Sequence, residues 1–269
     1  MEKLTATAAK QSIRIALLHF APRPDDVRHN LDLLESLFLK AVGLQADLIL
    51  TPELATSGYE FYKALGREWI KSDGQNIIKR FSELARQHKV ALVLGSPVYE
   101  AQSEKYYNAA LFIDEDGQLI GEHHKISVLP GAEEWSSPGL DLKPVAWRGH
   151  KIGLLICADA YPEKISAELA KQGSTVLISL AAWAPGLHGP DGEWERRSKQ
   201  TGLCLFVCNR TGNESLMNFE GSSSVAGVDG RRVVEYSDKH PAILTIDVRA
   251  GDWSPKNERF NIFKFNENP

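Results

Sequence analysis

The sequence contains few cysteines and no excess of positive charge. Its 269 residues include three cysteines, Cys157, Cys204 and Cys208, and this odd number argues against a disulfide framework. Lysine and arginine number 31 against 35 aspartates and glutamates, which gives a formal net charge of -4 at pH 7. Without a basic field the chain has no general means to bind phosphate backbones or anionic lipid. Nucleic-acid and membrane-surface binding are therefore not expected.

Long apolar segments are also absent. No run approaches the roughly 20 apolar residues that cross a bilayer, and residues 1–11 lack the apolar core of a secretory signal. These absences predict a cytoplasmic protein without a membrane span.

Several motifs that identify common enzyme classes do not occur. The sequence has no GxGxxG after a strand, no GxxxxGK[ST], no HExxH and no GxSxG, so nucleotide-phosphate cradles and the usual serine-hydrolase signal are missing. His123 and His124 are adjacent in an expected strand and would face opposite sides, so they would not share a metal ion. Cys204 and Cys208 lie four apart in another strand, about 13 Å from each other, and are interpreted as core residues.

Hydrophobic periodicity alternates between strand and helix along the whole chain. The first half predicts strands at 13–20, 46–53 and 91–98, helices at 26–43 and near 74–88, and a hairpin at 106–125. The second half predicts a hairpin and strand at 145–157, a helix at 162–172, a strand at 175–183, a helix near 191–201, a strand at 203–209 and a hairpin at 223–236. This order favours a mixed α/β architecture with two similar halves.

The absence of a proline-rich or serine-rich linker favours a single domain over residues 1–269. Within it we expect a short N-terminal extension of about residues 1–11. The tail from about 251 to 269 is rich in asparagine, lysine and aromatic residues, and is interpreted as an arm that packs on a partner.

Three titratable residues follow expected strands at the point where each strand ends. They are Glu53, Lys125 and Cys157. In α/β sheets ligands collect at the carboxyl ends of strands, so these side chains are candidates for one site. A carboxylate, an ammonium and a thiol suffice for thiol-based acyl transfer, as base, oxyanion partner and nucleophile. Taken singly, each also has an ordinary explanation as a loop carboxylate, a surface lysine or an inert buried thiol.

The segments around these residues resemble the nitrilase superfamily of carbon-nitrogen hydrolases. The matching stretches are LILTPELATSGY, GEHHKISVLPGAEEWSSPG, KIGLLICADAYPE and GSSSVAGVDGRRV, which follow the family's order and spacing along most of the chain. The resemblance implies a four-layer αββα sandwich that forms a homodimer or a larger homo-oligomer. It also implies a catalytic triad on Glu53, Lys125 and Cys157, and neither a cofactor nor a metal.

The resemblance also implies further site residues. Many relatives carry a second glutamate after the lysine, and here Glu133 and Glu134 compete for that position. Eight residues on from Lys125 gives Glu133, whereas four back from Pro138 gives Glu134, which is slightly favoured. The backbone N–H of Ala158 would help Lys125 to hold the oxyanion.

The substrate pocket is less well defined by the sequence. Tyr59 lies within the first matching segment and is assigned to substrate binding. Trp183 and Asn209 follow two further strands and are either pocket residues or, respectively, a core aromatic and a turn cap. The loop from Cys157 to Pro162 is shorter than in many relatives and lacks their arginine, so no subfamily's substrate carries over.

The function expected from the resemblance is hydrolysis of a small non-peptide amide through a cysteine thioester, with release of ammonia or an amine. Hydrolysis of an N-carbamoyl amine or acid, or of a nitrile, is an alternative. A member that has lost catalysis and serves as a scaffold or partner-binding protein belongs to a different class. The complete triad argues against it.

Overall fold

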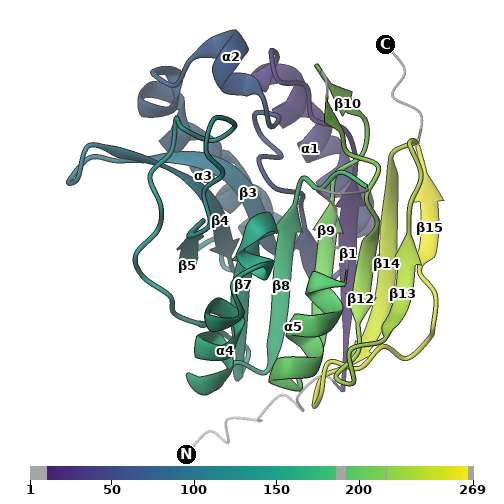
Figure 1. The fold of residues 1–269 in the computed structure, drawn as a ribbon. Coiled ribbons are helices and arrows are strands. Elements are labelled where there is room, and N and C mark those ends of the chain that lie inside the picture. The colour runs from purple at the N-terminus through teal and green to yellow at the C-terminus, as the bar shows by residue number, and fades with distance from the viewer. Residues whose placement is uncertain (1–10, 186–191, 216, 266–269) are drawn as a thin grey trace, which may run out of the picture.

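The computed structural model describes residues 11–185, 192–215 and 217–265. Almost all of the expected N-terminal extension therefore lies outside the described residues. The described residues form two large sheets, a two-stranded sheet, five α-helices and a short 3-10 helix (Figure 1). Among the described residues, no helix combines the length and the apolar character needed to cross a bilayer.

The first sheet has seven strands, three of which, β1, β2 and β3, run parallel at its centre. In spatial order it contains β15 (Asn261–Lys264), β14 (Ala242–Arg249), β1 (Ser12–His19), β2 (Leu48–Leu50), β3 (Ala91–Glu100), β4 (Lys105–Ile113) and β5 (Leu119–His124). β2 is buried along its whole length, as expected for a continuous apolar run covered on both faces.

The second sheet has six strands and repeats this plan, with β7, β8 and β9 parallel at its centre. In spatial order it contains β13 (Arg232–Tyr236), β12 (Ser223–Ala226), β9 (Leu205–Asn209), β8 (Val176–Ala181), β7 (His150–Ile156) and β6 (Val145–Trp147). A separate two-stranded hairpin joins β10 (Asn213–Glu214) and β11 (Met217–Asn218).

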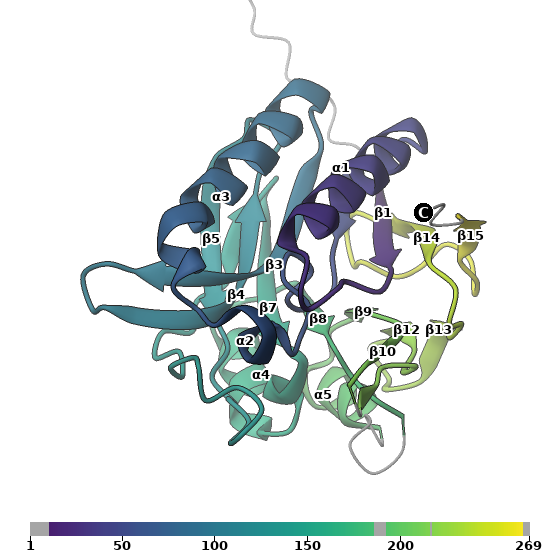
Figure 2. The ribbon, with the colours of Figure 1, turned by 90° about the horizontal axis from the view of Figure 1, so that it is seen from above.

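Four helices of the described residues cover the outer faces of the two sheets. They are α1 (Val27–Gly43), α3 (Trp69–His88), α4 (Glu163–Lys171) and α5 (Glu193–Thr201). The short α2 (Phe61–Leu65) instead packs through Phe61 on Trp135. Seen from above, α1 and α3 lie outside the seven-stranded sheet, and α4 and α5 lie outside the six-stranded sheet (Figure 2). This confirms the expected four-layer αββα sandwich.

Two hydrophobic clusters hold the layers together. One contains residues of both sheets, including Leu17 and Leu50 from the first and Leu154 and Phe206 from the second. The other lies between the seven-stranded sheet and its helices, where Leu34, Phe38, Ile77 and Phe81 are buried. The apolar face expected for residues 26–43 accounts for this packing, and Asp26 caps α1 by accepting a hydrogen bond from the His29 N–H at 2.9 Å.

The C-terminal region returns to the first sheet. β14 pairs antiparallel with β1 over eight residue pairs, and β15, within the expected arm, pairs with β14. The described part of the arm thus packs on its own chain, and packing on a partner stays a prediction. The single domain also stays a prediction, which a single cooperative unfolding transition would test.

Candidate active site

The three strand-end residues lie where the two sheets face each other. Glu53 follows β2 and Lys125 follows β5, both in the seven-stranded sheet. Cys157 follows β7 of the six-stranded sheet and opens a short 3-10 helix, Cys157–Ala160. Its φ of 46° places a residue with a Cβ in the left-handed region. Such strain between a strand and a helix is typical of a nucleophile presented to substrate.

Lys125 is fully buried between two carboxylates. Its Nζ lies 2.8 Å from Glu53 Oε1 and 2.5 Å from Glu133 Oε1. Burial alone would lower the pKa of this ammonium, but the two carboxylates outweigh it and hold the pKa well above the usual value. Lys125 therefore remains a buried positive charge.

Glu53 accepts hydrogen bonds from three directions. Oε1 accepts from Lys125 and, at 2.7 Å, from Asn108 Nδ2, while Oε2 accepts from the Ala182 N–H at 3.0 Å. Burial raises the pKa of Glu53 to about 7, with Glu133 adding to the rise and Lys125 opposing it. A carboxyl group with this pKa can both accept and return a proton near neutrality.

The thiol of Cys157 is buried and neutral at rest. Burial raises its pKa well above the usual value, the charge of Glu53 adds to the rise, and Lys125 opposes it. The Cys157 Sγ lies 3.9 Å from the Ala182 carbonyl oxygen, and the N–H of the same residue binds Glu53. The Cys157 thiol and the Glu53 carboxylate therefore both contact the backbone of Ala182. Because the thiol is protonated, it needs a base to become a nucleophile.

Glu133, rather than Glu134, contacts the lysine. Glu133 is fully buried, its Oε1 binds Lys125, and its Oε2 accepts the Leu129 N–H at 2.9 Å. Glu134 is exposed and lines a surface cavity. The slight preference for Glu134 as the glutamate that contacts Lys125 is therefore wrong. Counting back from Pro138 does not reveal which of two adjacent side chains turns inward.

Tyr59 lies at the boundary between this cluster and a cavity of about 380 Å³. The tyrosine is 3% exposed and lines the cavity together with residues of α2 and of the 131–134 segment. Burial raises the pKa of its hydroxyl, and the charges of Lys125 and Glu133 also act on it. Tyr59 thus faces both the cavity and the field of the charged cluster.

The remaining expected site residues are all buried. Ala158 lies in the first turn of the 3-10 helix, where a backbone N–H has no acceptor within the helix. Asn209 accepts from the Trp183 N–H at 2.8 Å and donates to the carbonyls of Trp183 and Gly221. Its side chain thus joins the segment after β8 to the segment before β12, and Trp183 packs against Tyr161 and Trp194. A substrate contact by either residue stays a prediction.

Two glycines allow backbone segments of the site to approach their neighbours. A Cβ on Gly95 of β3 would lie 2.1 Å from the Pro52 carbonyl oxygen, just before Glu53. A Cβ on Gly139 would lie 2.2 Å from the His124 carbonyl oxygen, and the Gly139 N–H donates to Lys125 O at 2.8 Å. Glycine is thus required beside both charged residues.

Three polar residues of the site were not assigned from the sequence. Asn108 on β4 donates to both Glu53 and Glu133. Asp159 and His123 form a buried pair, with 2.7 Å between Asp159 Oδ2 and His123 Nε2. A polar residue within the apolar stretch YYNAALF was a signal for Asn108, whereas the pairing of Asp159 depends on how the sheets pack.

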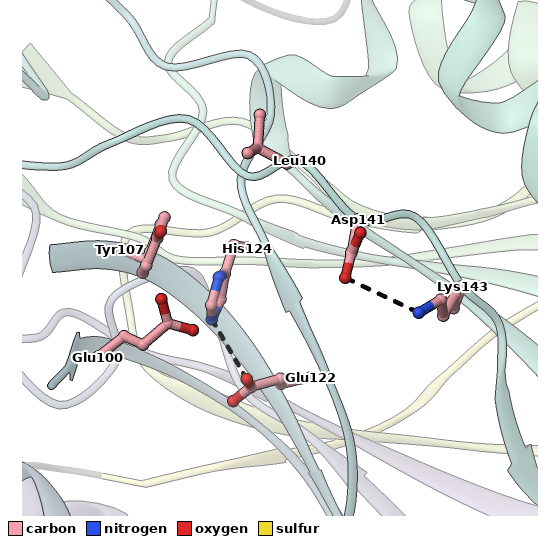
Figure 3. A pocket seen from close by; sticks show the side chains of 7 residues that line it. All are labelled: Glu100, Tyr107, Glu122, His124, Leu140, Asp141 and Lys143. Atoms are coloured by element: carbon pink, nitrogen blue, oxygen red, sulfur yellow. Dashed lines mark ion pairs between the residues drawn. The ribbon is translucent and has the colours of Figure 1, made fainter. Parts of the chain in front are cut away.

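His124 points to a different region, as expected for neighbours on a strand. Its ring stacks on Tyr107 with centroids 4.0 Å apart, beside Glu122 at 3.5 Å. Both line a pocket of about 340 Å³ with Glu100 and Asp141 (Figure 3). Among the described residues, no group of three or more His, Cys, Asp or Glu side chains is arranged to hold a metal ion.

Comparison with known proteins gives a consistent assignment. Residues 14–257 match the carbon-nitrogen hydrolase family. The chain is 28% identical over 255 residues to a probable nitrilase of Schizosaccharomyces pombe, covering 93% of each chain. It is 27% identical over 280 residues to N-carbamoylputrescine amidase of Arabidopsis thaliana, covering 95% of this chain and 92% of the relative.

A solved structure gives the same result. It is a variant of the amidase from Nesterenkonia sp. with the acetamide moiety of fluoroacetamide added covalently at the active-site cysteine. The two share a TM-score of 0.78 and 26% sequence identity, covering 92% of this chain and 94% of the amidase. The chain therefore belongs to the carbon-nitrogen hydrolase family, in agreement with its resemblance to the nitrilase superfamily.

Proposed function

We propose that this enzyme hydrolyses a small non-peptide amide through a thioester on Cys157 and releases ammonia or an amine. The observation that carries the proposal is the buried Lys125 ammonium, held by Glu53 and Glu133 at the carboxyl end of β5. A neutral thiol, a base with a pKa of about 7 and a permanent cation are the groups that amide cleavage by a cysteine requires.

In the first half-reaction Glu53 takes the proton of the Cys157 thiol, and the sulfur bonds to the amide carbon. Lys125 and the Ala158 N–H stabilise the tetrahedral oxyanion, a contribution of several kcal/mol when such donors are positioned in advance, roughly 3 to 4 for one donor. The carbon–nitrogen bond then breaks as Glu53 returns its proton to the nitrogen. Ammonia or an amine leaves, and a thioester remains.

In the second half-reaction Glu53 takes a proton from water, and the oxygen bonds to the thioester carbon. The carbon–sulfur bond then breaks, and Glu53 returns the proton to sulfur. Glu133 keeps Lys125 in place during both steps, because it binds the ammonium directly and is itself held by the Leu129 N–H.

Two further observations support a small substrate. The cluster itself leaves little open surface, since Glu53 is 1% and Cys157 is 5% exposed, which suits a small molecule rather than a folded chain. The relatives include an amidase with an acetamide moiety at its cysteine and an N-carbamoylputrescine amidase. Both support an acyl or carbamoyl group at Cys157.

The test is ammonia release from purified protein across matched amides, ureides and nitriles, with Cys157→Ala as the control. Intact-mass analysis after acid quench is expected to show one acyl adduct on the peptide that contains Cys157. A nitrile would give a thioimidate first, about one mass unit lighter than the thioester from the matching amide. A folded wild-type protein that forms no adduct and releases no ammonia would leave the non-catalytic scaffold as the better assignment.

We also propose that the enzyme is a cytoplasmic homodimer or larger homo-oligomer. The exposed Ile262 and Phe263 on the edge strand β15 support a contact between copies, and the three free thiols support a reducing compartment. Light scattering on the purified protein tests the first point. Fractionation of the source cells tests the second.

A further inference from the structure

One buried carboxylate contacts the backbone beside both the lysine and the cysteine. Asp159 Oδ1 accepts the N–H groups of Ile126 at 3.1 Å and Ser127 at 2.8 Å, directly after Lys125. Asp159 Oδ2 accepts the N–H of Ile156 at 3.1 Å, directly before Cys157. The same side chain therefore joins the two strand ends that carry the cation and the nucleophile.

His123 completes this contact from the other sheet. It lies on β5, two residues before Lys125, and its Nε2 is 2.7 Å from Asp159 Oδ2. His123 is 4% exposed and Asp159 is fully buried. Burial alone would raise the pKa of Asp159, but the hydrogen bond from His123 and those from the backbone outweigh it and lower the pKa. Asp159 is therefore an ionised acceptor.

The position of Lys125 requires such a contact. β5 is the edge strand of the seven-stranded sheet and is paired only with β4 there. Cys157 belongs to the other sheet, so no ladder of strand hydrogen bonds fixes its distance from Lys125. His123 lies on β5 of the seven-stranded sheet, and Asp159 lies in the 3-10 helix that follows β7 of the six-stranded sheet. Their contact therefore joins the two sheets.

We propose that Asp159 and His123 are a positioning pair that sets the separation of Lys125 from Cys157 across the two sheets. The inference rests on the proposed function, since it concerns how the nucleophile and the oxyanion partner are aligned. Asp159 is not assigned to proton transfer with substrate, because both of its carboxylate oxygens are already bound within the protein. A displacement of about 1 Å between reacting groups can reduce the rate about 10²-fold.

The test uses Asp159→Asn, His123→Leu and His123→Gln in the full chain. Asparagine would present an N–H to the Ile156 N–H, and leucine would remove the donor to Asp159. Glutamine keeps an N–H that can reach the carboxylate and serves as the rescue variant. Urea unfolding and circular dichroism establish that each variant is folded.

Asp47→Asn is the matched control. Asp47 precedes β2 at the opposite end from Glu53, accepts the Arg14 N–H at 2.9 Å, and lies 3.4 Å from Arg148 in the turn between β6 and β7. It is thus another buried carboxylate that joins the two sheets, but away from the site. It should lose stability and keep its acylation rate.

For Asp159→Asn and His123→Leu we expect the single-turnover acylation rate to fall about 10²-fold while KM changes little, and His123→Gln to recover about tenfold of that loss. The alkylation rate of Cys157 by iodoacetamide, followed by peptide mass analysis, should fall in the same order. Unchanged acylation in the folded variants, or an equal loss in Asp47→Asn, overturns the proposal. If the wild type turns over no amide, the proposed function fails, and the alkylation rates alone decide the positioning role.

Discussion

The two sheets share a strand plan but contribute different chemistry to the site. Each has three parallel strands at its centre, and each delivers side chains at their carboxyl ends. The seven-stranded sheet and its loops supply every charged group of the cluster, Glu53, Lys125 and Glu133. The six-stranded sheet supplies a neutral thiol and the N–H groups of Ala158 and Ala182.

The charged side chains of the cluster and the nucleophile therefore come from different sheets. Buried charges are tolerated when they are paired and hydrogen-bonded. The first sheet and its loops supply the ion pairs of the cluster, and the Ala182 N–H of the second sheet completes the hydrogen bonds of Glu53. Burial raises the pKa of the Cys157 thiol in the second sheet, so in the proposed mechanism a base from the first sheet must take its proton. Neither sheet alone can carry out acyl transfer, so activity depends on how the two are aligned.

The largest expected effect comes from removing the nucleophile of the six-stranded sheet. Cys157→Ala should reduce turnover by about 10⁴-fold or more, since no other group can form the thioester. The folded state should change little, because only one sulfur atom is lost. Steady-state ammonia release and urea unfolding measure the two effects. Ordinary activity in this variant would contradict the thioester mechanism.

The next effect tests the base in the seven-stranded sheet. Glu53→Gln keeps the shape of the side chain but cannot take up a proton, so we expect both half-reactions to slow by about 10²- to 10⁴-fold. Burst kinetics with an activated ester separate the two steps. Normal deacylation in this variant would require another base for the water.

The pH dependence of the wild type follows from the same carboxyl group. Because Glu53 must be ionised to accept the thiol proton, kcat/KM should rise with pH through an apparent pKa of about 7. No fall is expected just above neutrality, since the carboxylates hold the pKa of Lys125 well above its usual value. A profile that falls between pH 6 and pH 8, about one unit either side of this pKa, would rule out this assignment.

The adjacent glutamates give a smaller and sharper test. Glu133→Gln should lower the acylation rate by roughly 10²-fold, because it weakens the hold on Lys125, whereas Glu134→Gln should be nearly silent. The two variants are matched in chemistry and differ only in which way the side chain points. Equal mild effects would show that Glu133 is not part of the machinery.

The sequence predicted those parts of the site that lie at strand ends. Glu53, Lys125 and Cys157 each follow an apolar run, so strand periodicity and the edge rule place them together. Glu133 and Glu134 lie in a segment without regular structure, and no periodicity tells which one turns inward. Asp159 and His123 meet across the sheets, and one-dimensional patterns contain no information on how two sheets are offset.

Most of the fold was predicted from the sequence, but one strand and the smallest elements were not. The four layers followed from the resemblance, and the order of helices and strands followed from periodicity. β14 was not named, although its residues AILTIDVR are rich in β-branched side chains and could have been recognised. The short helix α2 and the β10–β11 hairpin are too small for a periodic signal, and packing around Phe61 and Phe219 places them.

The smallest expected effects concern the two cysteines outside the site. Cys208 is fully buried on β9, and its Sγ lies 3.3 Å from the Leu50 carbonyl oxygen of the other sheet. Cys204 is 2% exposed, and burial raises its pKa to about 11. Replacing either with alanine should lower the free energy of unfolding by about 1 to 3 kcal/mol and leave kcat unchanged, with Cys208→Ala the costlier because it opens a gap between the sheets. Urea titration and steady-state kinetics measure both quantities. If folded Cys208→Ala instead shows a clear fall in kcat, the alignment of the two sheets limits the rate, and not only the identity of the groups at the strand ends.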